Sequence, residues 1–248
     1  NITRDHTEIM LKSFGADIKI TKDEYSKIIT VNGGREMLSK NISVPSDLSS
    51  ASFFIVAALI NENSNIKIKN ININPTRDGI LKALKKMGAK IQIINKKIVN
   101  EEIVADLEIS SCKLNGCELN EDMSKLMIDE YPILSIAASF ANSPSVFRGL
   151  SELKVKESDR LELIRYNLVN CGVDCKVEKD SLFIFPNKKY LLKNTNIRTD
   201  YDHRIAMSFA IMGSKLESTL NIEDSHSINT SFPNFIELFN KIGGNLIE

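Results

Sequence analysis

The sequence repeats one pattern four times: an amphipathic helix pattern, a glycine, and a short apolar strand pattern. The four copies contain Gly15, Gly88, Gly172 and Gly243. A glycine that directly follows a helix can take a positive φ angle and so end the helix. The glycines are roughly 70–85 residues apart, which makes each unit larger than the repeat of a solenoid protein. The chain is therefore predicted to consist of several similar helix-and-strand units.

A second kind of helix accompanies the last three copies. We predict these helices at residues 49–60, 131–141 and 203–212, which are apolar or small on every face after the first residues. A helix without a polar face is buried on all sides. Alternating strand patterns such as 66–69 and 181–185 lie between them. The sequence therefore predicts an α/β (α+β) fold with approximate three-fold symmetry, in which the units pack around their buried helices.

The Val-Pro-Ser-Asp stretch at residues 44–47 marks a predicted domain boundary. Residues 1–43, with one amphipathic helix and two strands, are interpreted as the last unit of a preceding domain. Residues 44–248 are interpreted as a domain of three units, of which the third, from Tyr190 onward, is incomplete. Because Asn1 already stands at a helix start, we expect the chain to be a fragment of a longer protein.

Composition argues against several classes of function. Lys plus Arg and Asp plus Glu both number 32, so the formal net charge is zero, whereas nucleic-acid and anionic-membrane binders carry a basic excess. The longest apolar run, residues 51–60, is too short to span a bilayer. The four cysteines form no CxxC pair and only three histidines are present, which argues against a metal site. Scattered free thiols are typical of a reducing, cytoplasmic setting.

Polar residues cluster just before the three predicted buried helices. They are residues 46–50, Asp129 with Glu130, and residues 200–204. Helix capping explains the serines and aspartates, which are preferred cap residues. Capping does not explain Arg204, because a cation at a helix N-terminus opposes the helix dipole. The alternative is an anion site at which several helix N-termini face one cleft and Arg204 completes the site.

A run of charges at residues 154–160 precedes the amphipathic helix predicted at 161–171. Lys156 lies four residues before Arg160 and Glu157 lies three before it, so all three would share a face if the helix included them. A solvated charge run is the simple interpretation. A carboxylate between two cations, however, also suits acid–base chemistry beside a phosphate.

Six segments together resemble the 5-enolpyruvylshikimate-3-phosphate (EPSP) synthase family. They are residues 4–8, 74–77, 127–134, 155–160, 202–209 and 230–233, in the family's order and spacing. The resemblance implies the enolpyruvyl transferase fold: two domains of βαβαββ-type units around buried parallel helices, with the substrates between the domains. It implies transfer of the enolpyruvyl group of phosphoenolpyruvate to the 5-hydroxyl of shikimate 3-phosphate, with release of phosphate, in aromatic amino acid biosynthesis. No cofactor is implied, and the full-length protein is expected to be a cytoplasmic monomer that binds neither nucleic acid nor membrane.

The resemblance implies catalytic roles for three residues. Asp129 would take the proton of the 5-hydroxyl and help to bind shikimate 3-phosphate. Glu157 would handle proton transfer at the methylene carbon of phosphoenolpyruvate. Lys156 would lie beside both the hydroxyl and the phosphate bridge, as a ligand of shikimate 3-phosphate and a proton donor.

Binding roles are implied for three arginines. Arg160 and Arg204 would bind phosphoenolpyruvate, whose carboxylate and phosphate suit guanidinium forks. Arg4 would contact shikimate 3-phosphate from the other domain. Thr230 stands where some family members carry a lysine that binds phosphoenolpyruvate, so that contact is expected to be absent or supplied elsewhere.

The family's N-terminal motifs do not occur in this sequence. They are a Lys-Ser-x-x-x-Arg segment, a glycine-rich loop, an Arg-Pro segment and a Ser-x-Gln segment, and they supply about half of the family's active site. We therefore expect the isolated chain to lack synthase activity.

Two other classes of protein were weighed. The sister enolpyruvyl transferase that acts on a UDP-amino sugar is disfavoured by residues 156–160 and 202–207, which resemble the shikimate enzyme. A DNA-encircling clamp is disfavoured by the uncharged buried helices and the zero net charge.

Overall fold

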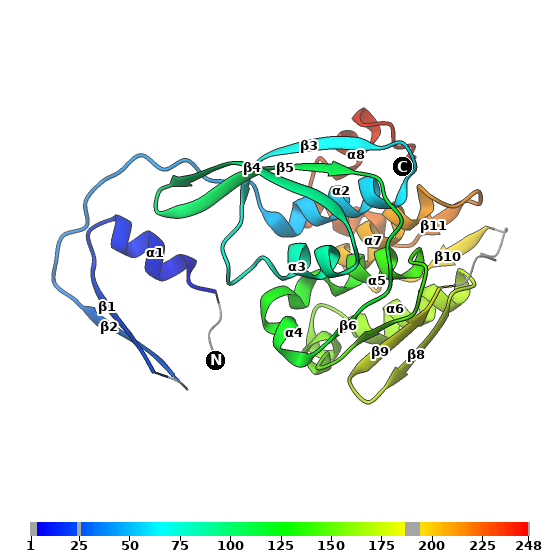
Figure 1. Ribbon diagram of the computed structural model, residues 1–248, viewed down its shortest axis with the longest axis horizontal. Helices are drawn as coiled ribbons and strands as arrows, with labels where there is room; N and C mark the ends of the chain where they lie inside the picture. Colours follow the sequence, from blue (N-terminus) through cyan, green and yellow to red (C-terminus); the bar gives the residue numbers. More distant parts are fainter. Residues whose placement is uncertain (1–3, 24–25, 187–193, 248) are drawn as a thin grey trace.

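The protein, seen in a computed structural model, is described over residues 4–23, 26–186 and 194–247. In Figure 1 a leading segment with α1, β1 and β2 lies beside a larger body that starts at α2. We use "leading segment" for residues 4–43 and "body" for the described residues from 44 onward. The predicted start of the third unit, Tyr190, lies outside the described residues.

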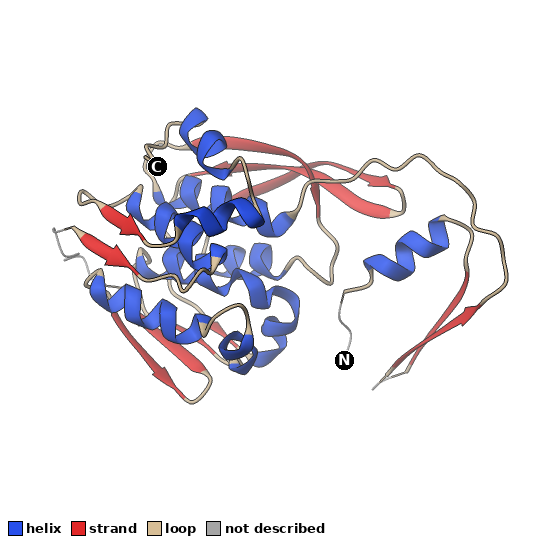
Figure 2. Ribbon diagram, turned by 180° about the vertical axis from the view of Figure 1, so that it is seen from behind, coloured by secondary structure: helices blue, strands red, loops and turns tan. Residues whose placement is uncertain are grey.

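The three predicted buried helices are confirmed, and they form the centre of the body. They are α2 (Leu48–Ile60), α5 (Tyr131–Ser139) and α7 (His203–Gly213), and each contacts the other two. Every residue of α5 is buried, as are most residues of α2 and α7. Figure 2 shows the strands of the body around the outside of these helices. The mixed α/β fold class predicted from the sequence is therefore confirmed.

The first unit of the body folds around α2. Its strands are β3 (Asn65–Asn72), β4 (Lys90–Val99) and β5 (Glu102–Ser110), with α3 (Gly79–Lys86) between β3 and β4. The strands form an antiparallel sheet in the order β3-β5-β4, in which Ile66 lies opposite Ile109. Alternate residues of β5, such as Leu107 and Ile109, are fully buried, as the alternating pattern of a one-sided sheet requires.

The second unit folds around α5. Its strands are β6 (Glu118–Leu119), β7 (Ser145–Phe147), β8 (Asp174–Glu178) and β9 (Ser181–Phe185), in the order β6-β7-β9-β8. Its other helices are α4 (Glu121–Met127), the 3₁₀ turns η1 (Ile128–Glu130) and η2 (Ser151–Val155), and α6 (Arg160–Asn170). The turn η1 runs directly into α5 and so presents its polar side chains at the start of a buried helix.

The third unit folds around α7. Its elements are β10 (Thr195–Ile197), β11 (Leu220–Ile222), the 3₁₀ turn η3 (Ser225–Thr230) and α8 (Phe235–Lys241). Among the described residues its sheet is a parallel pair, β10 with β11. The ring of Phe235 packs edge-on against Phe53 of α2, with 6.0 Å between ring centroids, so the third unit closes against the first.

All four glycines of the repeat end a helix, as predicted. Gly15, Gly88, Gly172 and Gly243 have φ angles of +85°, +86°, +85° and +103°. After α6, the Val173 N–H bonds the Leu168 carbonyl at 2.9 Å and the Gly172 N–H bonds the Val169 carbonyl at 2.9 Å. The same pair of bonds follows α1, α3 and α8. These are Schellman caps, in which a residue at positive φ lets two otherwise unpaired carbonyls accept hydrogen bonds.

The leading segment contains the predicted helix and two strands: α1 (His6–Ser13), β1 (Asp17–Lys22) and β2 (Lys27–Asn32). The two strands form an antiparallel hairpin in which Asp17 lies opposite Asn32. No residue of α1 is buried, and Ile28 and Val31 of β2 are exposed. The assignment of residues 1–43 to a separate domain stays a prediction. Among the described residues no helix is both long and apolar enough to cross a membrane.

Candidate active site

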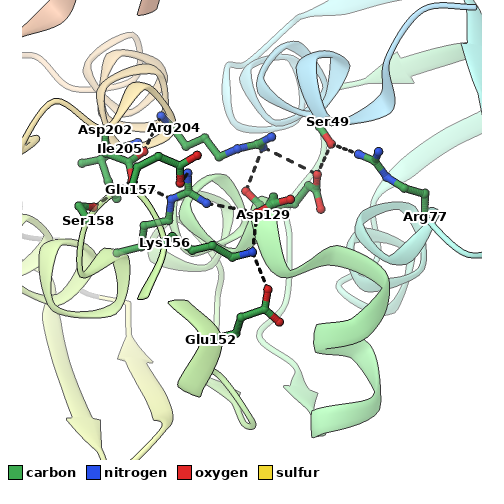
Figure 3. A network of polar contacts seen from close by, with 12 residues as sticks. Ser49, Arg77, Asp129, Glu152, Lys156, Glu157, Ser158, Asp202, Arg204 and Ile205 are labelled. Atoms are coloured by element: carbon green, nitrogen blue, oxygen red, sulfur yellow. Dashed lines mark hydrogen bonds and ion pairs between the residues drawn. The ribbon is translucent and has the colours of Figure 1, made fainter. Parts of the chain in front are cut away.

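The carboxylate of Asp129 lies at the centre of a group of cations, shown in Figure 3. Its Oδ2 accepts a hydrogen bond from Arg4 Nη2 at 2.8 Å. Its Oδ1 lies 3.2 Å from Arg160 Nη1 and 3.5 Å from Lys156 Nζ. These cations come from the leading segment, the start of α6 and the loop before it. The fold thus brings together at one carboxylate residues that the sequence separates widely.

The surrounding charges keep Asp129 ionised. Burial by itself raises the pKa of this carboxyl, but the nearby charges of Arg204 and Lys156, together with the Arg4 hydrogen bond, outweigh burial. The net result lowers the pKa of Asp129 to about 2. At neutral pH its carboxylate is therefore an anion that accepts hydrogen bonds.

Capping does not account for Asp129. The residue at the N-cap of α5 is Glu130, and its side chain makes no cap hydrogen bond. Asp129 instead directs both carboxylate oxygens to cationic side chains. This outcome favours the second of the two interpretations that the sequence left open, a charged site at helix starts.

The other two clusters do contain caps, but aspartates provide them. Asp47 accepts from the Ser50 N–H at 2.8 Å at the start of α2, and Asp202 accepts from the Arg204 N–H at 2.9 Å at the start of α7. The expectation of serine caps is wrong for Ser49, whose hydroxyl donates to the side chain of Glu130. A buried carboxylate is the stronger acceptor available to that hydroxyl.

Arg160 is a buried cation with three carboxylate partners. Its side chain is 1% exposed. Its Nε donates to Asp202 Oδ2 at 2.8 Å and its Nη2 donates to Glu157 Oε2 at 2.5 Å, in addition to the contact with Asp129. Asp202 also accepts from the Ser158 hydroxyl at 2.9 Å. Arg160 therefore joins the start of α6 to the start of α7 and to η1.

The predicted shared helix face for Lys156, Glu157 and Arg160 is wrong. Helix α6 begins at Arg160 and is capped by Asp159, so the two preceding residues are not helical. The cap fixes the start because its side chain takes a backbone N–H that a longer helix would bond internally. Lys156 has an extended backbone and pairs with Glu152 at 2.5 Å. Glu157 nevertheless reaches Arg160, and its side chain is 53% exposed.

Arg204 is held more loosely than Arg160. Its Nη1 donates to the backbone carbonyl of Asp129 at 3.1 Å and lies 3.9 Å from Glu130 Oε1. Its side chain is 17% exposed. The unfavourable effect of a cation at the N-terminus of α7 is offset by Asp202, the anion that caps the same turn. A second arginine thus lies beside Asp129 with a partly accessible side chain.

The sequence analysis assigned no part in the charged site to three further residues beside it. Glu130 is buried, and burial raises its pKa. The Ser49 hydroxyl donates to Glu130, and Arg77 Nη2 donates to Ser49 Oγ at 2.5 Å. The available signals were the adjacent Asp129-Glu130 pair and the presence of Arg77 in the segment 74–77. Neither signal indicates which residues Glu130 and Arg77 contact.

The leading segment contacts the body near the same site. Besides Arg4, Asp5 Oδ1 accepts from Asn74 Nδ2 at 2.8 Å, and His6 Nδ1 lies 2.5 Å from Glu102 Oε1. A cavity of about 310 Å³ lies between the two parts and is lined by His6, Met10, Val44, Asp47, Arg77 and Glu102 among others. Arg4 therefore reaches Asp129 from a segment that has several other contacts with the body.

Thr230 does not extend the cation group. It ends η3, and its hydroxyl donates to the carbonyl of Ser227 at 2.7 Å. This local hydrogen bond accounts for the threonine without a ligand.

The fold is that of the enolpyruvyl transferases. The enolpyruvyl transferase NikO from Streptomyces tendae superimposes with a TM-score of 0.72 over 95% of this chain and 51% of that protein, at 15% identity, which shows the fold alone. A family model described as EPSP synthase (3-phosphoshikimate 1-carboxyvinyltransferase) matches residues 1–239. The chain belongs to this family.

Individual relatives agree with the family assignment. The 3-phosphoshikimate 1-carboxyvinyltransferase of Paramagnetospirillum magneticum is 42% identical over 245 residues, which is 98% of this chain and 55% of the relative. That of Pseudomonas sp. strain PG2982 is 43% identical over 99% of this chain and 55% of the relative. An EPSP synthase from Acinetobacter baumannii is 40% identical with a TM-score of 0.91, covering 99% of this chain and 56% of that protein. The chain spans about half the length of the relatives it matches.

Proposed function

We propose that this chain provides one half of the active site of a synthase that transfers the enolpyruvyl group of phosphoenolpyruvate to the 5-hydroxyl of shikimate 3-phosphate. The observation that carries the proposal is the ionised Asp129 among Arg4, Lys156, Arg160 and Arg204. Both substrates carry a phosphate and a carboxylate, which guanidinium and ammonium groups bind through charge-assisted hydrogen bonds. Family membership supports the same assignment.

The reaction consists of an addition and an elimination. In the addition, the 5-hydroxyl oxygen bonds to C2 of phosphoenolpyruvate, the hydroxyl proton leaves to Asp129, and C3 gains a proton. In the elimination, the bond between C2 and the phosphate oxygen breaks, phosphate leaves, and C3 returns a proton. Glu157 is assigned the proton transfers at C3, and Lys156 is assigned to the hydroxyl and to the bridging oxygen. General acid–base groups of this kind contribute about 10²–10⁴-fold to rate.

Anion binding and proton transfer are coupled in this proposal through Glu157. Of the three carboxylates on Arg160, Asp202 is buried and Asp129 is mostly buried, whereas Glu157 is half-exposed. An incoming substrate carboxylate or phosphate therefore replaces Glu157 on Nη2 of Arg160. The displaced Glu157 carboxylate is then available to the reacting carbon, next to the anion that displaced it.

The proposal includes the cytoplasm as the setting and a monomer as the working form. Cys117, Cys171 and Cys175 are buried free thiols, and burial raises the pKa of each. Buried protonated thiols are unreactive and suit a reducing compartment.

Complementation tests the proposed function. The chain, alone and mixed with the N-terminal half of the Pseudomonas sp. strain PG2982 relative, is given phosphoenolpyruvate and shikimate 3-phosphate, and released phosphate is measured. We expect release from the mixture, none from either half alone, and strongly reduced release when the chain carries Asp129→Asn. Turnover by the chain alone would overturn the fragment expectation. Turnover of a UDP-amino sugar in place of shikimate 3-phosphate would assign the chain to the sister activity.

A further inference from the structure

Glu130 is a buried carboxylate that the proposed mechanism does not use. Its side chain is 5% exposed, although it stands next to the catalytic candidate Asp129 in η1. A buried carboxylate is costly unless it is hydrogen-bonded or paired. Glu130 has both kinds of partner: Oε1 accepts from the Ser49 hydroxyl and lies 3.9 Å from Arg204 Nη1.

Glu130 and the residues that surround it come from all three units of the body. Ser49 is in the first turn of α2, and Arg77 precedes α3, so both belong to the first unit. Glu130 itself belongs to the second unit and Arg204 to the third. Arg77 donates to Ser49 Oγ at 2.5 Å and also lies 3.6 Å from Asp47, the cap of α2. The three buried helices therefore meet at this carboxylate by their N-terminal ends.

We propose that Glu130, held by Ser49 and Arg77, is a positioning residue that fixes the guanidinium of Arg204 for the anionic substrate. The proposal rests on the function proposed above, because it concerns how that site holds phosphoenolpyruvate. Glu130 does not touch the reacting atoms. It acts through Arg204, which has the partial exposure that a ligand group needs.

Arg160 and Arg204 have different contact partners, so Glu130 affects the position of Arg204 and not that of Arg160. Arg160 has three carboxylate partners and keeps its place without Glu130. For Arg204, the ion pairs of the described residues include one partner, Glu130, and the second restraint is the Asp129 carbonyl at 3.1 Å. In Figure 3 the Ser49 side chain lies between the side chains of Arg204 and Arg77. Loss of the Glu130 charge leaves Arg204 with the hydrogen bond to the Asp129 carbonyl and the charge of the Asp129 carboxylate.

The test combines kinetics with the nuclear magnetic resonance signals of the arginine side chains. Glu130→Gln keeps the size and an oxygen acceptor for Ser49 but removes the charge. Ser49→Ala keeps the charge and removes the hydroxyl that holds it, and it serves if the glutamine variant does not fold. The matched control is Glu8→Gln, which removes a glutamate whose side chain is 12% exposed and pairs with Lys27 at 2.6 Å in the leading segment. Arg204→Lys assigns the Arg204 Nη signals, and the Arg160 signals are an internal reference.

We expect Glu130→Gln to raise KM for phosphoenolpyruvate roughly tenfold in the complemented mixture, because a misplaced binding group can cost up to about 10²-fold. KM for shikimate 3-phosphate and kcat stay unchanged, and the Arg204 Nη signals broaden while those of Arg160 do not. Ser49→Ala has a smaller effect on KM for phosphoenolpyruvate and on the Arg204 signals, and Glu8→Gln changes neither this KM nor these signals.

A purely structural role for Glu130 predicts a different pattern. In that case the Glu130→Gln and Ser49→Ala variants have lower thermal stability, but the folded variants keep the wild-type Arg204 signals and the wild-type KM for phosphoenolpyruvate. That result overturns the proposal. If the wild-type mixture releases no phosphate while Glu130→Gln still broadens only the Arg204 signals, the proposed function fails and the positioning of Arg204 by Glu130 stands.

Discussion

The start of α6 and the start of α7 each bring an arginine to Asp129, but they hold it in opposite ways. Arg160 at the start of α6 is 1% exposed and pairs with three carboxylates. Arg204 in the first turn of α7 is 17% exposed, and its one carboxylate partner among the ion pairs of the described residues lies 3.9 Å away. The same residue type at the same carboxylate thus experiences two different environments.

The difference separates a structural cation from a ligand cation. A buried cation that pairs with a buried carboxylate, as Arg160 does with Asp202, stabilises the fold only while both partners are present. A partly exposed guanidinium with donors to spare can bind an incoming anion at little structural cost. The resemblance implies that both arginines bind phosphoenolpyruvate. In the function proposed above, Arg204 would do so directly, whereas Arg160 would first exchange Glu157 for the substrate.

The largest expected effect is on stability at Arg160. Arg160→Ala leaves Asp202 buried without its cation, and breaking a buried ion pair in this way costs about 3–5 kcal/mol. The free energy of unfolding, measured by chemical denaturation of the chain, should fall by that amount. Arg165 lies five residues after Arg160 in α6, is partly exposed and pairs with Glu162, so Arg165→Ala should cost less than about 1 kcal/mol. Equal losses in the two variants would contradict the structural role of Arg160.

The second-largest expected effect is a fall in kcat when Glu157 is replaced. Glu157→Gln removes the proton-transfer group but keeps its size, so kcat in the complemented mixture should fall about 10²–10⁴-fold. Stability should change little because the side chain is 53% exposed. Glu162→Gln is the matched control, since Glu162 is 51% exposed and pairs with an arginine at the same i,i+3 spacing. Near-normal kcat in a folded Glu157→Gln variant would remove this residue from the mechanism.

A smaller effect is expected on substrate affinity at Arg204. Arg204→Ala removes a charge-assisted contact, worth roughly 1.5–3 kcal/mol, from phosphoenolpyruvate binding. It should lower the free energy of unfolding less than Arg160→Ala does, because Glu130 lies 3.9 Å from Arg204 and keeps its hydrogen bond from Ser49. Affinity is measured by calorimetric titration of the complemented mixture with phosphoenolpyruvate. Arg198→Ala, an exposed arginine paired with Asp200, is the control and should bind normally.

Local features of the fold could be predicted because the sequence carries them locally. The four Schellman caps follow from glycines that end amphipathic patterns, and the three buried helices follow from segments without a polar face. The start of α6, predicted at residue 161, lies at Arg160, but the charge pattern left open whether Lys156 and Glu157 belong to the helix, because the spacing of Lys156 and Arg160 fits a helix whether or not one forms. The cap at Asp159 decides the matter, and it lies between them.

The polar partners at the site could not be predicted, because they are set by tertiary contacts. Ser49 and Glu130 are 81 residues apart in the sequence, and Arg160 and Asp202 are 42 apart. Serine before a buried helix is a preferred cap, and nothing local indicates that a carboxylate from another unit competes for its hydroxyl. The resemblance to a family identified Asp129, Arg160 and Arg204 as residues of interest. It did not distinguish the buried arginine from the accessible one.

The cations that both helix starts bring to Asp129 also make a testable contribution to acid stability. The folded pKa of Asp129 is lowered from 3.8 to about 2. A carboxyl with a lowered folded pKa adds stability above its unfolded pKa and loses it as pH falls through the folded value. At 1.36 kcal/mol per pKa unit, the shift corresponds to roughly 2 kcal/mol, present at about pH 4 and above and lost toward pH 2.

The measurement is the free energy of unfolding of wild type and Asp129→Asn between pH 2 and pH 7. Other carboxyls titrate in the same range, so the difference between the two curves is the relevant quantity. Because asparagine does not titrate, the gap in favour of wild type should be roughly 2 kcal/mol at neutral pH and should close as pH falls from about 4 to 2. A gap that is constant across this range would show that Arg160 and Arg204 do not act on Asp129 through charge, and the contrast between the two helix starts would then lose its electrostatic basis.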